Sequence, residues 1–304
     1  MVDGLLVIDK PAGPTSHDVV ARVRRLVGQR RVGHTGTLDP LATGVLPIVL
    51  GRATRLARFV TATEKTYEAT VRFGYATATD DSDGPRVGAC YSGPMPAIGA
   101  IDDALEAFRG QFLQRPPVVS AKKVGGTRSH RLARRDPGLC MDPAAAATIA
   151  LPAQPVRVSR LVIAGLDGDR LSLTVECSAG FYVRALARDL GERLGIGAHL
   201  TSLRRTQTGD LTLREAIALE RAEREAHTLA ERIVPIARML THLPAMTLGD
   251  AAVLRTVQGR DVEAGAAAME GRHVRLLDER GDLVAIAERS ALSPGVLHPS
   301  VVLR

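Results

Sequence analysis

Residues 34–46 read HTGTLDPLATGVL, and Asp39 is the one acidic side chain in this stretch of small, hydroxyl-bearing and apolar residues. No other lysine, arginine, aspartate or glutamate lies between Arg31 and Arg52, although 24% of the chain is charged. Two interpretations are open. The Asp-Pro pair is typical of a turn, and the neighbouring glycines permit positive φ. Alternatively, Asp39 performs chemistry in a partly desolvated pocket.

The segments on either side of this stretch alternate between strand and helix patterns. Thr15 and Asp18 have the spacing of a capping box at the start of a helix. Apolar spacing predicts an early buried strand, a helix after the capping box, and further strands and helices up to residue 239. The predicted strands are 4–10, 45–51, 65–74, 156–166 and 170–180, and the predicted helices are 15–27, 53–60, 101–112, 181–195 and 215–239.

Two later segments have a different character. Residues 114–155 contain paired prolines, paired glycines, a basic run and an alanine-rich patch, which is typical of a long excursion from a compact domain and often of a functional one. From about residue 243 the pattern changes to short strands and turns, with a hairpin expected near Arg280-Gly281. A small β-rich second domain is therefore expected at the C-terminal end.

Composition limits the class of protein. The 304 residues are enough for a sizeable core and two domains, and no run of 18 apolar residues predicts a membrane-spanning helix. The first residues lack the pattern of a secretory signal, and the three cysteines (Cys90, Cys140 and Cys177) have no metal-binding spacing. These features favour a protein of the reducing cytoplasm without a structural zinc ion.

The positive charge is unevenly distributed. The net charge is +7, yet residues 22–58 carry eight arginines and one acid, and residues 109–135 carry eight basic residues and no acid. Two long basic segments fit a phosphate-binding surface, whereas solvated faces without a partner are the plainer alternative. The acidic residues collect in 79–84 and 212–232.

No phosphate-binding loop, dinucleotide fingerprint, zinc-protease motif or serine-hydrolase motif is present. Asp80, Asp81 and Asp83 could hold a metal ion, but an acidic loop is more often solvated, and we expect that here. Tyr67 and Tyr182 are core residues or stacking surfaces for a base. Arg184 is a surface charge or the partner that holds Asp39 ionised.

Seven separated blocks, in order along the chain, resemble the bacterial TruB-type tRNA pseudouridine synthases. The most specific block is GHTGTLDPLATGVLPIVLGRATR at 33–55. The others are LLVIDKPAGPTSHDVV (5–20), KTYEATVRFG (65–74), TATDDSDG (77–84), FRGQFLQRPPVVSAKK (108–123), CSAGFYVRALARDLGERLGIGAHLTSLRR (177–205) and a small C-terminal domain.

The resemblance implies an α+β fold, with a mixed β-sheet catalytic domain with flanking helices at residues 1–240 and a PUA-like C-terminal domain at residues 241–304. It also implies an isomerase active in tRNA processing. The uridine at tRNA position 55, in the TΨC loop, would be flipped out, and its glycosidic bond to N1 would be exchanged for a bond to C5. Such an enzyme needs no cofactor and no metal, binds the T arm of tRNA, and is expected to be a monomer that requires no protein partner.

The resemblance also implies roles for single residues. Asp39 matches the essential aspartate, Tyr67 the tyrosine that stacks on the target base, and Arg184 the arginine that pairs with the carboxylate. Tyr182 and Leu203 match residues around the flipped nucleotide, and His34 matches a histidine that contacts the opened loop.

The excursion at 114–155 resembles the family's mobile thumb, but this chain departs from the family pattern there. Val119 stands where a tyrosine is common, and Ser129-His130 replaces an apolar-tyrosine pair. Two other functions remain to be distinguished from the isomerase, an RNA-binding or RNA-folding protein without chemistry and a carboxylate-dependent nucleoside hydrolase.

Overall fold

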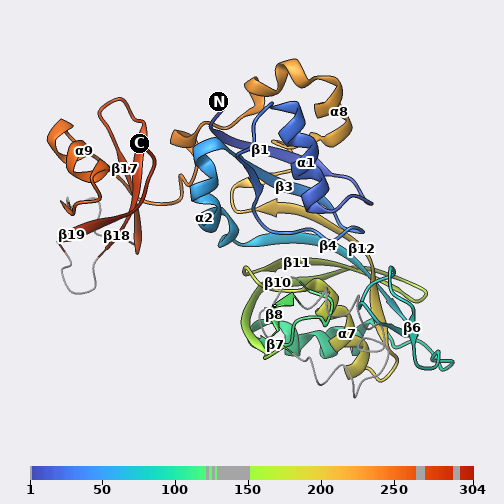
Figure 1. Ribbon diagram of the computed structural model, residues 1–304. Coiled ribbons are helices and arrows are strands. Elements are labelled where there is room, and N and C mark those ends of the chain that lie inside the picture. Colours follow the sequence, from blue (N-terminus) through green and yellow to red (C-terminus); the bar gives the residue numbers. More distant parts are fainter. Residues whose placement is uncertain (1, 121–122, 125–126, 129–150, 265–270, 290–294) are drawn as a thin grey trace.

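The structure is a computed structural model that describes residues 2–120, 123–124, 127–128, 151–264, 271–289 and 295–304. Figure 1 shows a long, strongly twisted main sheet with helices along it, and a smaller lobe of strands from the C-terminal part of the chain. The arrangement confirms the predicted α+β fold with a mixed sheet and a β-rich C-terminal region.

The main sheet has ten strands in the order β14-β1-β3-β12-β4-β11-β10-β7, with β2 added to β3 and β13 added to β12. The β1–β14 and β3–β12 pairs are parallel and the other pairs are antiparallel, so the sheet is mixed. The strands are β1 (Gly4–Lys10), β2 (Val32–His34), β3 (Thr43–Leu50), β4 (Lys65–Phe73), β7 (Gly110–Gln114), β10 (Gln154–Asp167), β11 (Arg170–Cys177), β12 (Ala198–Thr208), β13 (Leu211–Thr212) and β14 (Ile217–Ala218).

The sheet is buried on both faces where β1 lies. Leu6 and Ile8 belong to one hydrophobic cluster, and Leu5 and Val7 belong to another. Successive side chains of a strand point to opposite faces, so the unbroken apolar run of β1 supplies both clusters. The first cluster holds the helices that bear on the candidate site, and the second faces the C-terminal lobe.

Helix α1 (Ser16–Leu26) begins where the sequence predicts. Thr15 accepts a hydrogen bond from the backbone N–H of Asp18 (3.1 Å), and Asp18 accepts one from the backbone N–H of Thr15 (2.8 Å), which confirms the capping box. The other helices are α2 (Ala57–Thr61) after the 3-10 turn η1 (Gly51–Leu56), α3 (Ile98–Leu105), α7 (Val183–Arg193), α8 (Leu219–Arg224) and α9 (Asp250–Val257). None of the helices that the structure describes has the length and apolar content needed to cross a membrane.

Three predicted helices are wrong in part. In the helix expected at 53–60, residues 53–56 belong to the 3-10 turn η1 and only the rest is α-helix. The helix expected at 101–112 ends with the 3-10 turn η2 (Glu106–Phe108), because Gly110 adopts a φ of +75° and begins the strand β7. The helix expected at 215–239 is broken into α8 and the 3-10 turns η3 (Ala226–Arg232) and η4 (Ile236–Arg238).

The break in the last of these helices has a tertiary cause. Val234 leaves the helical path and exchanges two backbone hydrogen bonds with Leu5 of β1, at 2.8 and 2.9 Å. Pro235 follows directly, and the residue before a proline is biased away from helix. Pairing with the sheet therefore overrides the helical propensity of this polar segment.

The C-terminal lobe is a five-stranded sheet in the order β15-β17-β18-β19-β16, covered on one side by α9. The predicted hairpin is confirmed, since β17 and β18 are antiparallel and Gly281 in their turn has a φ of +81°. Leu283, Ile286 and Val301 of this lobe join Leu5 and Val7 of β1 in one cluster. The strands are β15 (Ala245–Thr247), β16 (Val262–Glu263), β17 (His273–Leu277), β18 (Leu283–Arg289) and β19 (Val296–Val302). The division at 240/241 and the PUA-like character of the lobe stay predictions.

Four short strands form two two-stranded sheets. β5 (Ala76–Thr77) pairs with β6 (Arg86–Val87), and β8 (Lys123–Val124) pairs with β9 (Thr127–Arg128). Much of the predicted thumb, including Ser129-His130, lies outside the described residues. Its two ends are placed by neighbouring strands, because Gln114 of β7 is paired with Gln154 of β10.

Candidate active site

The structure brings Asp39 and Arg184 together. The Nε of Arg184 donates a 2.9 Å hydrogen bond to Oδ2 of Asp39, across 145 residues of sequence. The side chain of Arg184 is 5% exposed and that of Asp39 is 33% exposed. A buried cation therefore holds one oxygen of a carboxylate that faces open space, which suits a carboxylate that acts on a bound molecule.

Asp39 lies in a loop between β2 and β3 whose backbone is held by cations from other strands. Lys10, at the end of β1, donates from Nζ to the carbonyl oxygens of Pro40 (3.2 Å) and Ala42 (2.7 Å). Arg205 of β12 donates to the carbonyl oxygens of Gly36 (3.0 Å) and Val45 (2.7 Å). Charged donors to carbonyls are stronger than neutral ones, so the loop is fixed on both sides of Asp39.

Helix α1 fixes the same loop from a third direction. The hydroxyl of Ser16 donates to the carbonyl of Leu38 and accepts from its N–H, both at 2.9 Å. The backbone of Gly13 also donates to the carbonyl of Pro40 at 2.9 Å. The residue before Asp39 and the residue after it are thus both anchored, and the direction of the carboxylate follows from the fold rather than from the loop alone.

A second carboxylate faces Arg184. Oδ2 of Asp81 lies 3.6 Å from Nε of Arg184, and the side chain of Asp81 is 6% exposed. Arg184 also donates to the carbonyls of Thr79 (2.8 Å) and Val119 (3.1 Å). One guanidinium therefore joins the loop of Asp39, the acidic loop and the segment that follows β7.

The expectation of a solvated acidic loop is wrong for Asp80 and Asp81. Asp81 is buried, and Asp80 forms a 3.0 Å ion pair with Arg188 of α7. Burial is the main cause of a raised pKa at both carboxyl groups, and it takes the pKa of Asp80 to about 6. The two arginines of α7 oppose this rise, since each attracts the charged form of its neighbouring carboxylate.

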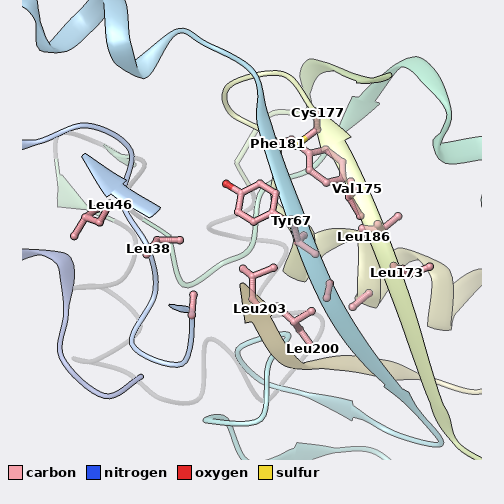
Figure 2. Packing of buried hydrophobic residues seen from close by; sticks show 14 of the residues in the cluster. Leu38, Leu46, Tyr67, Leu173, Val175, Cys177, Phe181, Leu186, Leu200 and Leu203 are labelled. Atoms are coloured by element: carbon pink, nitrogen blue, oxygen red, sulfur yellow. The ribbon is translucent and has the colours of Figure 1, made fainter. Parts of the chain in front are cut away.

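Tyr67 lies on β4 beside the loop of Asp39. It is 8% exposed and belongs to the hydrophobic cluster that includes Leu38, Leu203 and Phe181. Figure 2 shows its hydroxyl turned toward the loop that carries Leu38 and away from Phe181. Burial raises the pKa of Tyr67, whereas the neighbouring Arg205, which hydrogen-bonds to it, acts in the opposite direction.

Tyr182 and Leu203 reach the same region from two further elements. Tyr182 is the N-cap of α7, two residues before Arg184, and its backbone N–H and carbonyl both bond to the side chain of Gln114. Burial raises the pKa of Tyr182. The charge of Arg184 acts to lower this pKa, and the charge of Asp39 acts to raise it. Leu203 lies on β12 opposite Ala69 of β4. Tyr182 therefore lies near the Asp39–Arg184 pair, and Leu203 packs in the same hydrophobic cluster as Tyr67 and Leu38.

His34 is at the edge of the site, at the end of β2. Burial, together with the charges of His17 and Arg205, lowers its pKa to about 4, so the ring is neutral at pH 7. His17 and His34 form an edge-to-face ring pair with centroids 5.2 Å apart. A neutral ring at the edge of the site is suited to contact with a base.

The region around Asp39 is rich in buried positive charge, although its own sequence is poor in it. The side chains of Lys10, Lys65, Arg184 and Arg205 are each buried. Burial lowers the pKa of Lys10 and of Lys65 to about 8. In the part of the chain that the structure describes, no three histidine, cysteine, aspartate or glutamate side chains are grouped to hold a metal ion.

Several of these residues were missed by sequence reasoning. Lys10 and Arg205 act through backbone carbonyls, so no spacing of side chains marks them in the sequence. Lys10 did carry one signal, because it is one of only four lysines in the chain and directly precedes a proline at the end of an apolar run. Asp81 carried none beyond its place in an acidic loop.

Comparison with solved structures defines the class of fold. A chain in the structure of the archaeal box H/ACA sRNP Nop10-Cbf5 complex is similar, with a TM-score of 0.72 and 24% identity, over 99% of this chain and 86% of that chain. A chain of a Cbf5-Nop10-Gar1 complex gives a TM-score of 0.73 and 24% identity, over 99% and 85%. The fold of this chain is thus shared with both of these chains.

Sequence comparison identifies the family. The TruB family pseudouridylate synthase N-terminal domain matches residues 24–183, and the tRNA pseudouridylate synthase B C-terminal domain matches residues 184–241. The chain belongs to the TruB family of pseudouridylate synthases, as its resemblance in sequence predicts.

Individual relatives are similar over nearly their whole length. The tRNA pseudouridine synthase B of Solibacter usitatus is 43% identical, over 99% of this chain and 100% of that protein. The tRNA pseudouridine synthase B of Mycobacterium tuberculosis is 42% identical, over 97% of this chain and 98% of that protein.

Proposed function

We propose that this protein isomerises the uridine at position 55, in the TΨC loop of tRNA, to pseudouridine. The observation that carries the proposal is the Asp39–Arg184 pair, placed in a chain whose relatives are tRNA pseudouridine synthases B. A protein that only binds RNA has no use for a carboxylate aimed at a polyanion. The basic segments at 22–58 and 109–135 suit the phosphates of a T arm.

The reaction exchanges one bond for another within the same nucleotide. The bond from C1′ to N1 of uracil breaks, the base turns, and a bond from C1′ to C5 forms. The hydrogen at C5 leaves as a proton, and N1 takes up a proton, so the product is an isomer of the substrate. No atom is oxidised or reduced, and no group leaves the nucleotide. Asp39 starts the reaction, either by attack at C1′ or by removal of the proton at C2′.

Arg184 orients Asp39 for either route. It occupies Oδ2 of the carboxylate, and its other two nitrogens bind the carbonyls of Thr79 and Val119, which fixes its own direction. Cleavage of the glycosidic bond places negative charge on the detached uracil. The buried cations Lys10, Lys65 and Arg205 supply a fixed positive field for this charge without having to reorganise.

The remaining residues would receive the flipped nucleotide. Tyr67 supplies a ring for stacking on the uracil, and Tyr182 and Leu203 enclose it. Stacking on an aromatic ring contributes about 1–3 kcal/mol per base, which offsets the few kcal/mol needed to extrude a nucleotide from its loop. His34 contacts the loop from which the nucleotide has left.

The proposed function includes a monomeric state. One chain contains Asp39, Asp81 and Arg184, so a single copy holds every group that the proposed reaction uses. We therefore infer that a monomer works on tRNA in the cytoplasm, without a protein partner, metal ion or cofactor.

The test is release of tritium from a tRNA transcript labelled at C5 of uridine, since isomerisation frees that hydrogen. The wild type should release one equivalent from the T loop, and Asp39→Asn should release none while it still binds tRNA. Asp167→Asn, at an exposed carboxylate at the end of β10, is the matched control and should be fully active.

Other results would identify the alternatives. Tight binding by the wild type without tritium release would favour an RNA-folding protein. Free uracil in the reaction mixture would indicate a hydrolase, because isomerisation retains the base.

A further inference from the structure

Arg188 lies one turn after Arg184 on α7 and repeats its pattern of contacts. Its Nη1 forms a 3.0 Å ion pair with Oδ2 of Asp80, and its Nη2 donates to the carbonyl of Arg115 at 2.9 Å. Its Nε donates to the adjacent Asp189 at 2.9 Å. The side chain is 18% exposed, and its contacts with Asp80 and Asp189 are partly buried, whereas the contact with the carbonyl of Arg115 is exposed.

The two arginines form two parallel connections from α7. Arg184 reaches Asp81 and the carbonyl of Val119, and Arg188 reaches Asp80 and the carbonyl of Arg115. Each therefore joins one residue of the acidic loop to one backbone carbonyl of the segment after β7. Only Arg184 continues to the carboxylate that performs the chemistry.

Asp80 is held in a conformation that needs external support. Its φ is +62°, a left-handed value that an aspartate adopts at a cost in free energy. Its backbone carbonyl accepts from the N–H of Leu200 at 3.0 Å, and its N–H donates to the carbonyl of Thr77 at 3.2 Å. Arg188 holds the side chain, so all parts of the residue are fixed.

The turn at Asp80 determines where its two neighbours point. Thr79 offers its carbonyl to Arg184 at 2.8 Å, and Asp81 offers its carboxylate at 3.6 Å. A shift in the backbone at Asp80 must move at least one of these two acceptors. Burial takes the pKa of the Asp80 carboxyl group to about 6, and the nearby charge of Arg188 acts against this rise.

We propose that Arg188 is a positioning residue for the isomerisation, which fixes the strained turn at Asp80 and thereby the acceptors that aim Arg184 at Asp39. This inference rests on the proposed function. Arg188 touches neither the substrate nor Asp39, and it acts through the loop. Since a misplacement of about 1 Å at a reacting group can cost about a hundredfold in rate, loss of Arg188 should slow the chemical step more than it weakens RNA binding.

The experiment measures kcat, KM and the melting temperature of Arg188→Met, Arg188→Lys and Asp80→Asn, together with the double variant Arg188→Met/Asp80→Asn. Arg193→Met is the matched control, because Arg193 is an exposed arginine in the last turn of the same helix. Arg188→Met should lower kcat about 10- to 100-fold and leave KM within about threefold. Arg188→Lys should recover part of kcat, because it retains a charge for Asp80 but not the fork that also reaches Arg115.

The double variant separates positioning from independent effects. If Arg188 acts through Asp80, the double variant should be no slower than Arg188→Met alone, whereas independent contributions would multiply. An unchanged kcat in Arg188→Met would overturn the proposal. So would a rise in KM alone, which would indicate an RNA contact, or a loss of folded protein with unchanged activity per folded molecule.

A crystal structure of Arg188→Met supplies a readout that needs no turnover. The proposal requires the hydrogen bond between Arg184 and Asp39, 2.9 Å in the wild type, to lengthen or break. Retention of that bond would overturn the proposal even if the wild type failed to make pseudouridine. Absence of tritium release by the wild type would instead count against the proposed function, so the two failures are distinguishable.

Discussion

The guanidinium of Arg184 lies between two carboxylates, with Nε 2.9 Å from Asp39 and 3.6 Å from Asp81. The two carboxylates differ in their environment, since Asp81 is 6% exposed and Asp39 is 33% exposed. Asp81 thus balances the charge of the arginine within the protein. Asp39 remains partly open to solvent, as the proposed function requires of a group that acts on a bound nucleotide.

Replacement of Arg184 by alanine should therefore damage turnover and stability by different routes. Turnover should fall by about 10²–10⁴-fold, because Asp39 loses its orientation. The free energy of unfolding should fall by about 1–3 kcal/mol, because Asp81 becomes a buried group without its partner. Single-turnover kinetics and chemical denaturation measure the two effects.

The double variant Arg184→Ala/Asp81→Asn is the control for this assignment. It should regain part of the lost stability without regaining turnover. Recovery of turnover together with stability would mean that Arg184 has only a structural role.

The pH dependence of stability should reveal Lys10. Burial lowers the pKa of its folded form from 10.5 to about 8, so the unfolded chain binds more protons between these two values. The contribution of Lys10 to the free energy of unfolding is therefore lowest below about pH 8, and it rises as the pH increases toward 10.5. Denaturation of wild type and Lys10→Met across pH 7–10.5 measures the difference.

The difference in stability between wild type and Lys10→Met separates the effect of Lys10 from the effects of the other groups that titrate between pH 7 and 10.5. Lys65, whose pKa is also lowered to about 8, is present in both proteins and cancels. Parallel curves for wild type and Lys10→Met would show that the ammonium group of Lys10 is not disfavoured in the folded state.

The local part of the fold could be predicted from the sequence. The strand β1, the capping box of α1 and the β17–β18 hairpin depend on residues close together in the chain, so their patterns are sufficient. Asp39 stood out for a similar reason, as a lone charge in an apolar stretch. Pairing of Asp39 with Arg184 was one of two alternatives for that arginine, and the family resemblance favoured it.

The parts that could not be predicted depend on long-range packing. Asp80 and Asp81 have the composition of a solvated loop, and their burial is set by α7, about a hundred residues later in the chain. Val234 has helical neighbours but is paired with Leu5 at the other end of the chain. The carbonyl contacts of Lys10 and Arg205 involve no side-chain partner in the loop, so no residue type in that loop could indicate them.

Gly44→Ala should separate β3 from β12. Gly44 has a φ of +100°, and a Cβ atom there would overlap the backbone carbonyl of Arg205. The strained backbone alone costs about 1–3 kcal/mol, and displacement of Arg205 would also release the loop of Asp39. The melting temperature and the rate of tritium release should therefore both fall.

Gly33→Ala is the matched control, since a Cβ at Gly33 would meet only a Val49 methyl group at 3.7 Å. Equal losses in the two variants would indicate that the close approach at Gly44 is not required.

The logarithm of the association constant for tRNA should fall linearly with the logarithm of the salt concentration. Each phosphate contact contributes about 0.7–0.9 to the slope through counterion release. Arg30 and Arg31 are exposed and lie just before β2, which ends at His34, so their joint replacement by glutamine should reduce the slope. Filter binding at several salt concentrations measures this effect.

Arg214→Gln is the control for salt dependence, because Arg214 is an exposed arginine within the acid-rich segment 212–232. The slope should not change in this variant. If the slope fell equally in Arg214→Gln and in the Arg30/Arg31 double variant, the result would not assign the RNA-binding surface to Arg30 and Arg31.

The loop of Asp39 is held by Lys10, Ser16, Arg184 and Arg205, which come from β1, α1, α7 and β12. The ribosome synthesises Asp39 long before Arg205, so the nascent chain carries the Asp39 carboxylate through much of synthesis without all of the groups that fix its position. Contacts between residues this far apart in sequence also form late and slowly during folding. A chain truncated before Arg205 should therefore be inactive rather than partly active, and gain of activity during refolding should report the closure of β12 between β3 and β4.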